Sequence, residues 1–227
     1  MKFTSPLTLV VAVTAAVAIL PSCSNMNLGG SGLAAYHAYD LPTKLPSNPN
    51  NVRVKVSLTK QRAYVMEGTK MLLAMPVSVG TPQTPTHPGS YTIFSKEQKH
   101  RASTHGYAYS GNQVKQTFLD KKPSGWSFKG TPMPYWCEFS PNYGFHAGWL
   151  KHYPCTHGCI RLHENLAPKF FRLVKVGTPV NIASSQPEDA TYGNIPLPPD
   201  AGPLPDYSGS MYVGDGYFTQ HIKPVYQ

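Results

Sequence analysis

The stretch that decides the fold spans residues 143–162 and reads YGFHAGWLKHYPCTHGCIRL. It places a thiol, Cys159, thirteen residues after the histidine His146. Only a thiolate attacks a carbonyl carbon well, and a free cysteine is mostly protonated at neutral pH, so a nucleophilic cysteine needs an imidazole nearby to take its proton. The stretch therefore predicts a cysteine nucleophile with His146 as its base, provided that the chain folds back on itself.

The neighbours of the thiol support this chemistry without deciding it. Gly158 leaves room for a substrate carbonyl beside the backbone, where the amides of Gly158 and Cys159 can hold an oxyanion. Arg161 supplies a fixed cation that steadies the thiolate or binds a substrate carboxylate. Inert packing of the cysteines is an open alternative. A zinc site is another, because zinc-ligand residue types cluster here: Cys155, His157, Cys159 and His163.

The run Thr-His-Gly-Cys-Ile-Arg at residues 156–161, preceded by Gly-Phe-His-Ala-Gly, resembles the [Ser/Thr]-His-Gly-Cys signature of the L,D-transpeptidase catalytic domain, also called YkuD. The short loop between the two blocks is similar to that of one subgroup of the family. The resemblance implies Cys159 as nucleophile and His146 as general base. It also implies that the backbone carbonyl of Ala147, instead of a carboxylate, orients the imidazole, and that no metal or cofactor takes part.

The resemblance further implies a substrate, the stem peptides of peptidoglycan. The terminal D-alanine of a tetrapeptide donor would leave, and an amine of a neighbouring stem would accept the acyl group in a 3→3 cross-link. Water or a protein lysine as acceptor remains an alternative, as does a wall-binding lipoprotein without activity. Residues expected to bind substrate are Arg161, Thr156, His157, Tyr135 and Trp149, and Trp136 is expected to line the groove beside Tyr135. Loop shaping or core packing would explain some of them equally well.

The amino terminus has the pattern of an export signal. Lys2 precedes an apolar run over residues 7–20 that is short for a membrane span. Leu-Pro-Ser-Cys at residues 20–23 resembles a bacterial lipobox, which predicts lipid attachment at Cys23, with ordinary cleavage as the alternative because proline is uncommon there. We expect residues 1–23 to direct export to the periplasmic face of the envelope, and residues 24–51, rich in Gly, Pro, Asn and Ser, to form a tether.

Composition is compatible with this location. Twenty Lys and Arg against eleven Asp and Glu give a formal net charge of +9. These cations are scattered along the chain, and export argues against nucleic acid as a partner, so an anionic polymer such as cell wall is the better match. In an oxidising compartment Cys137 and Cys155 would either pair or stay free, and their spacing does not decide between the two.

The remaining pattern predicts a mostly β domain over residues 52–183, with the β-sandwich-like L,D-transpeptidase fold and one or two short helices. Residues 52–58 alternate apolar and polar, as a strand with one buried face does. Further strands are expected along the rest of the domain. One helix is also expected, with Asn165 as its cap and Gly177 as its end. The predicted strands cover residues 61–66, 71–79, 90–94, 131–139 and 179–182.

Two segments lack such a pattern. Residues 95–130 are polar and glycine-rich, which predicts a long functional loop or lid with His100 and His105 on its surface. Residues 184–227 are rich in Pro and Tyr and predict an arm that wraps the domain or stays loose.

Overall fold

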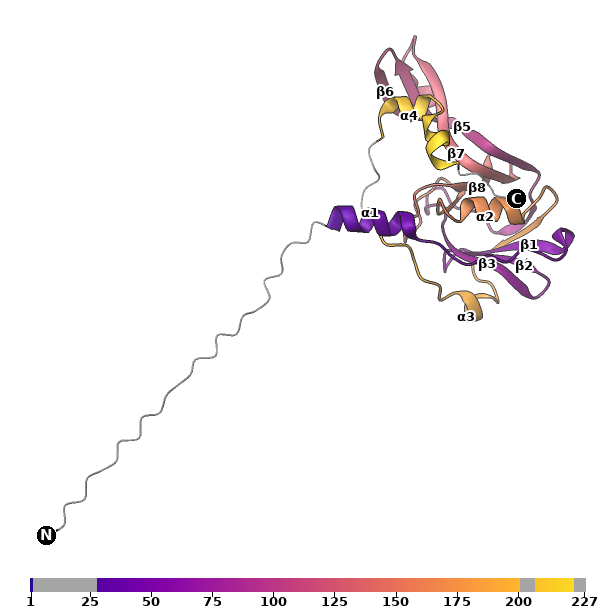
Figure 1. Ribbon diagram of the computed structural model, residues 1–227. Coiled ribbons are helices and arrows are strands. Elements are labelled where there is room, and N and C mark those ends of the chain that lie inside the picture. Colours follow the sequence, from indigo (N-terminus) through magenta and orange to yellow (C-terminus); the bar gives the residue numbers. More distant parts are fainter. Residues whose placement is uncertain (2–27, 201–206, 223–227) are drawn as a thin grey trace.

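The computed structural model describes residues 1, 28–200 and 207–222, and shows one ten-stranded mixed sheet with short helices around it (Figure 1). The expected mostly β fold is confirmed, whereas the predicted lipidation site Cys23 lies outside the described residues. The strands are β1 (Val52–Ser57), β2 (Arg62–Glu67), β3 (Lys70–Ser78), β4 (Gly89–Thr92), β5 (Ser95–Ser110), β6 (Gln113–Phe118), β7 (Ser127–Ser140), β8 (Tyr143–Ala147), β9 (Ile160–Leu162) and β10 (Pro179–Ala183). Their order across the sheet is β4-β10-β1-β2-β3-β9-β8-β7-β5-β6.

The helices are mostly outside the predicted domain. They are α1 (Leu28–Ala38), α2 (Ala167–Leu173), α3 (Asp189–Tyr192), α4 (Gly209–Val213) and α5 (Gly216–His221), with 3-10 turns at Pro49–Asn51 and Leu119–Lys121. Of the described α-helices, only α2 lies within residues 52–183. In the ranges 28–200 and 207–222, every helix is too short or too polar to cross a membrane.

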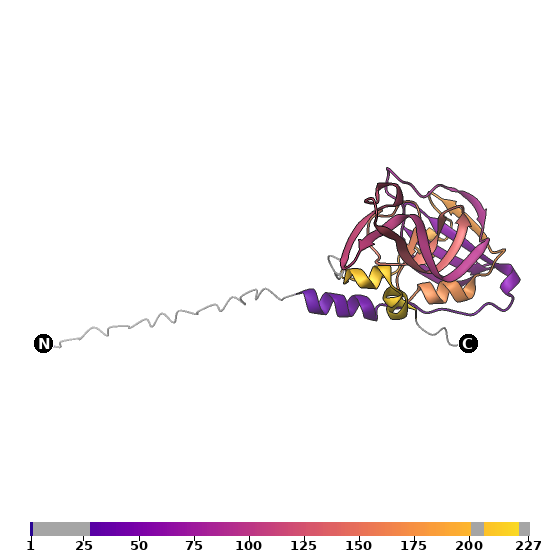
Figure 2. The same cartoon turned by 90° about the horizontal axis from the view of Figure 1, so that it is seen from above.

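The core lies where the sheet curves around α2 (Figure 2). Along β1 the valines at 52, 54 and 56 are buried, while Arg53 is exposed, which is the two-residue period of a half-buried strand. Phe145 of β8 packs on Phe170 of α2 with ring centroids 4.6 Å apart. Burying each such side chain contributes about 1.5–3 kcal/mol, so β8 is held firmly against the core.

The prediction of a long irregular loop over residues 95–130 is wrong. Most of this segment is the strand pair β5 and β6, and β5 also pairs with β7 from Ser95, opposite Glu138, to Tyr109, opposite Ser127. Within β5 only Gly106 and Ala108 are buried. A strand with so few buried apolar side chains has no apolar–polar alternation from which it could be predicted.

The predicted helix and tether also differ from the structure. Asn165 does not cap α2, which begins at Ala167 without a side-chain cap and ends at Leu173, before Gly177. The side-chain amide of Asn165 instead donates to the backbone carbonyls of His37 and Tyr39, at 2.7 and 2.9 Å. The described part of the expected tether therefore packs on the domain.

The described part of the carboxy-terminal arm packs on the domain. Figure 1 shows α4 and α5 beside the end of the sheet that β5, β6 and β7 form, whereas α3 lies near β1 and β2. Gly209 at the start of α4 lies so close to Val114 of β6 that a Cβ atom there would come within 2.6 Å of its side chain. Of the two expectations, an arm that wraps the domain and a loose arm, the described part of the arm fits the first.

Candidate active site

Strand pairing brings the two halves of the motif together. The strands β8 and β9 run parallel, with Phe145 opposite Ile160 and His146 opposite Arg161. Cys159 immediately precedes β9, so it lies at the same end of the strand pair as the start of β8. His146 and Cys159 both line one cavity of about 660 Å³. Parallel neighbours need a long crossover, which explains why the thiol comes thirteen positions after the histidine.

The imidazole of His146 is oriented by the backbone. Its Nδ1 lies 2.8 Å from the carbonyl oxygen of Ala147. Because a carbonyl oxygen only accepts, Nδ1 carries the hydrogen and Nε2 is the nitrogen that can take a proton. Burial and, to a smaller extent, the Arg161 cation lower the pKa of His146 to about 3, and the hydrogen bond to Ala147 only partly opposes them. The ring is therefore neutral at pH 7, as a general base must be.

The thiol of Cys159 is also neutral at rest. Burial raises its pKa above the ordinary value, while a hydrogen bond with the backbone of Gly144 and the charge of Arg161 act in the opposite direction. Its Sγ lies 3.7 Å from the carbonyl oxygen of Asn142. A neutral thiol and a neutral imidazole in one cavity correspond to base-assisted attack, in which the proton moves as the sulfur bonds to carbon.

Gly158 is required by the shape of the loop. Its φ is +105°, a region that favours glycine, and a Cβ atom would lie 2.3 Å from Cε1 of Tyr143. The space beside Gly158 is thus filled by the Tyr143 ring, whereas the sequence suggested that it admits a substrate carbonyl. Any larger residue here would move the loop that carries Cys159.

Thr156 and Gly158 close this loop internally. The Gly158 amide donates to Thr156 Oγ1 at 3.2 Å, and that hydroxyl donates to the carbonyl oxygen of Cys159 at 2.6 Å. Thr156 is buried and shapes the loop. In this structure the Gly158 amide is already engaged, which corrects its expected role in the oxyanion hole and leaves the Cys159 amide as the candidate donor.

Threonines of the segment following β3 support the loop and were not singled out from the sequence. Thr86 Oγ1 donates to the carbonyl oxygen of Gly158 at 2.8 Å and accepts from the Gly80 amide at 2.9 Å. Thr84 Oγ1 donates to the carbonyl oxygen of Thr156 at 3.0 Å. Thr86 is buried, so its hydroxyl satisfies backbone groups that water cannot reach. A threonine in a proline-rich loop carries no signal for such a role.

Arg161 extends from β9 into the cavity. Its Nη1 donates to the carbonyl oxygen of Trp149 at 3.0 Å and lies 3.7 Å from Cys155 Sγ. Its alkyl chain packs on Gly148, where a Cβ atom would come within 2.9 Å of it. Its charge lowers the pKa of both His146 and Cys159, so it acts on both partners of the proton transfer.

The predicted aromatic contacts divide between cavity and core. Trp149 lines the cavity and stacks on Tyr36 with ring centroids 4.1 Å apart. Tyr135 is fully buried in the core, against Phe171, and does not line the cavity, so its expected substrate contact is wrong. The neighbouring Trp136, also expected at the groove, does line the cavity, because successive side chains of β7 point to opposite faces.

The histidines expected on the surface also line this cavity. His100 stacks on Trp136 with centroids 4.4 Å apart and an interplanar angle of 6°. His105 lies 5.5 Å from the ring of His157, which also lines the cavity. His100 and His105 are thus half-exposed at the mouth of this cavity, on a strand and not on the expected loop. No pattern in the sequence indicated that β5 borders the thiol.

The other two cysteines in the described part of the chain, Cys137 and Cys155, are free thiols. Cys137 is buried in β7, and burial raises its pKa to about 12, which makes it unreactive. Cys155 is half-buried at the cavity. His163 packs under Tyr36, with its Nε2 3.0 Å from the Tyr36 carbonyl oxygen. Within the described ranges, no group of three or more His, Cys, Asp or Glu is arranged to hold a metal ion.

Comparison with known proteins gives a matching family model and similar solved structures. The family model described as the L,D-transpeptidase catalytic domain (YkuD) matches residues 51–182. No curated protein matches the chain. Similar solved structures include an L,D-transpeptidase from Mycobacterium smegmatis, with 19% identity, a TM-score of 0.45, and coverage of 59% of this chain and 58% of that one. Another, from Stackebrandtia nassauensis, has 22% identity, a TM-score of 0.45, and coverage of 72% and 69%. L,D-transpeptidase 3 from Mycobacterium tuberculosis has 20% identity, a TM-score of 0.45, and coverage of 59% and 61%. The chain thus spans less than two thirds of both mycobacterial structures.

Proposed function

The chain belongs to the L,D-transpeptidase catalytic domain (YkuD) family, and on this premise we propose that it uses Cys159 to transfer an acyl group between peptidoglycan stem peptides. The observation that carries the proposal is the common cavity of Cys159 and His146, in which Nδ1 of His146 is committed to the Ala147 carbonyl. That commitment leaves Nε2 as the proton acceptor. A thiol and an oriented imidazole are the parts that base-assisted acyl transfer needs.

The first half-reaction forms a thioester. As Cys159 Sγ bonds to the carbonyl carbon of the diamino acid in a stem tetrapeptide, its proton passes to His146 Nε2. The carbonyl oxygen becomes an oxyanion, which the amide of Cys159 stabilises. The carbon–nitrogen bond then breaks, and the imidazolium returns the proton to the leaving D-alanine amine. Both residues are then ready for the second step.

The second half-reaction transfers the acyl group. The side-chain amine of a neighbouring stem attacks the thioester and loses a proton to His146. The carbon–sulfur bond breaks, the sulfur takes back the proton, and a 3→3 cross-link is released. Neither step requires a group outside the thiol and the imidazole.

Three residues are proposed to contact the substrate in this cavity. Arg161 carries the positive charge for a substrate carboxylate, since guanidinium matches carboxylate geometry. Trp149 and His157 line the same cavity and offer aromatic surface to the peptide. Thr156 and Tyr135 are not proposed to bind substrate, because the first bonds within its own loop and the second lies in the core.

Incubation of the purified full chain with tetrapeptide muropeptides tests the proposal. Mass analysis should show D-alanine release and a 3→3 linked product, and the Cys159→Ala variant should give neither. Hydrolysed tripeptide alone would indicate an L,D-carboxypeptidase, and transfer to a lysine-containing protein would indicate an anchoring enzyme with the same nucleophile. Turnover retained by Cys159→Ala would overturn the assignment.

The cellular location is a separate proposal that rests on the amino-terminal pattern. We propose export to the periplasmic face of a bacterial envelope with a lipid anchor at Cys23. The mass of the mature amino terminus measures this directly: a diacylated cysteine is expected, and an unmodified start after residue 23 would contradict it.

A further inference from the structure

The catalytic cavity is completed by segments outside the matched family region. Tyr36 comes from α1, and four residues of the described arm reach the same wall: Tyr207, Tyr212, Tyr217 and His221. The family model ends at residue 182. Two flanks outside the matched region therefore form part of the cavity wall.

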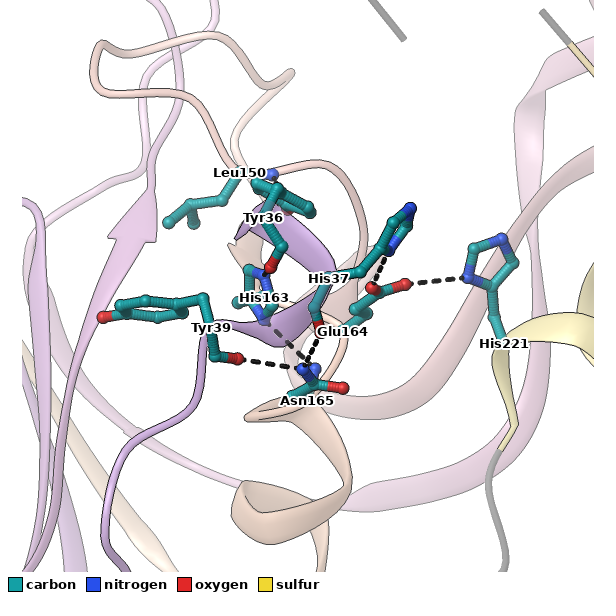
Figure 3. A network of polar contacts seen from close by, with 8 residues as sticks. All are labelled: Tyr36, His37, Tyr39, Leu150, His163, Glu164, Asn165 and His221. Atoms are coloured by element: carbon teal, nitrogen blue, oxygen red, sulfur yellow. Dashed lines mark hydrogen bonds and ion pairs between the residues drawn. The ribbon is translucent and has the colours of Figure 1, made fainter. Parts of the chain in front are cut away.

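One carboxylate joins the two flanks. Glu164, two residues beyond β9, has Oε1 hydrogen-bonded to Nδ1 of His37 in α1 and Oε2 3.5 Å from Nδ1 of His221 in α5 (Figure 3). Figure 3 shows the carboxylate between the two imidazoles. Among the described residues that line the cavity, Glu164 is the only acid. The chain thus places one negative charge where its two flanks meet.

The environment keeps this carboxylate charged. Its side chain is 13% exposed, and burial raises its pKa, but hydrogen bonds from His221 and His37 outweigh that effect and lower the pKa to about 2. His163 lowers it further, while Tyr36 and Tyr207 are the other titratable groups that face it. A buried carboxylate without these partners would be costly, so the two histidines and Glu164 favour each other's positions.

The arm has a second attachment on the other side of the cavity. Arg101 of β5 donates to the carbonyl oxygens of Tyr212, at 2.7 Å, and Gly214. Its guanidinium also lies over the ring of Phe218, 5.0 Å from the centroid. The arm therefore runs from β5 to Glu164, along the cavity that holds Cys159.

We propose that Glu164 is a positioning residue that ties α1 and α5 together, so that the tied flanks shield the thioester on Cys159 from water. The tie itself is inferred from the contacts of Glu164 with His37 and His221 in Figure 3. Its effect on the thioester rests on the proposed function. In hydrolysis a water oxygen adds to the thioester carbon, the carbon–sulfur bond breaks, and the thiol regains its proton. Closing segments over a reactive intermediate reduce this side reaction. Glu164 therefore favours transfer to an amine.

The decisive measurement is the partition of the acyl-enzyme between amine and water. Glu164→Gln keeps the shape of the side chain and removes its charge. We expect D-alanine release to stay within about twofold of the unaltered chain, while the ratio of hydrolysed to amine-transferred product rises about fivefold. His221→Phe removes only the tie to the arm and should raise the ratio by a smaller factor. This variant therefore still tests the tie if Glu164→Gln folds poorly.

A matched control removes an acid whose ion pair also holds the amino-terminal segment on the domain. Asp40 forms an ion pair with Lys169 of α2 at 2.7 Å and is exposed, away from the cavity. Asp40→Asn should leave the product ratio unchanged. A ratio that rises equally in this variant would mean that general loosening of the segment, not the tie at Glu164, is responsible.

A second readout does not depend on catalysis. The rate at which a bulky maleimide alkylates Cys159, followed by peptide mass analysis, should rise about threefold in Glu164→Gln and stay constant in Asp40→Asn. If the unaltered chain releases no D-alanine, the proposed function fails while this readout still tests the tie. An unchanged alkylation rate in Glu164→Gln overturns the inference whatever the activity.

Discussion

Nδ1 of His146 lies 2.8 Å from the carbonyl oxygen of Ala147, the residue that follows it in the chain. A backbone carbonyl therefore holds the imidazole where other cysteine and serine enzymes use a carboxylate. A carbonyl carries no full charge, so it favours the protonated ring less than a carboxylate would. This relationship allows His146 to remain neutral while buried.

The pH dependence of acylation should reflect this neutral ring. Because burial lowers the pKa of His146 to about 3, the base is available throughout the range in which an ordinary histidine would protonate. We expect the single-turnover rate of thioester formation, followed by intact mass, to change little as the pH falls from about 6.5 to 4.5. A half-maximal loss near pH 6.5 would show that His146 titrates like an exposed histidine.

Removal of the Arg161 charge should make Cys159 less reactive. The cation lowers the pKa of the thiol, so Arg161→Met raises that pKa and reduces the thiolate fraction at pH 8. Alkylation of Cys159 by iodoacetamide should slow about threefold, as measured by peptide mass analysis. Arg53→Met removes a similar cation from β1, which is not among the elements that line the cavity, and should leave the rate unchanged.

Gly158→Ala should destabilise the protein more than a matched glycine replacement. Gly177 also has a positive φ, +93°, but an added Cβ there meets nothing within 4 Å, whereas at Gly158 it would meet the Tyr143 ring. Gly177→Ala should cost about 1–3 kcal/mol from backbone strain alone. In urea unfolding, Gly158→Ala should lose more than Gly177→Ala; equal losses would mean that the ring moves aside freely.

Thr86→Val should disturb the loop that carries the thiol. The substitution keeps the side-chain shape and leaves the Gly80 amide and the Gly158 carbonyl without their buried partner. We expect a loss of about 1–3 kcal/mol in the free energy of unfolding and slower acylation of Cys159. Thr92→Val, on exposed β4, controls for the loss of a hydroxyl and should change neither quantity.

Glu164 should contribute stability that acid removes. Its pKa is about 2 in the folded chain and near the ordinary 4.5 when unfolded, so the contribution is present above pH 4.5 and declines as the pH falls toward 2. The difference in unfolding free energy between the unaltered chain and Glu164→Gln should therefore shrink between pH 5 and pH 3. A difference that stays constant over this interval would contradict the charge-based tie.

Several features of the fold could be predicted from local pattern. The alternation in β1 indicated a half-buried strand, and the spacing of apolar residues after Leu166 indicated one helix, because both signals arise from side chains that face a single core. The strand β5 gave no such signal, since it faces the cavity and solvent with few apolar residues. The ends of α2 were missed because Asn165 is used by a distant segment instead of the helix.

By itself the sequence determined the mostly β class, the family, and the residue types of the proposed chemistry, because these depend on local alternation and on a contiguous motif. Only the tertiary structure decided that Trp136 and not Tyr135 borders the cavity, that the Gly158 amide donates to Thr156, and that Glu164 joins the two flanks. Those outcomes depend on contacts between residues far apart in the chain. Such contacts are set by how the strands pair and the flanks pack, which no local pattern encodes.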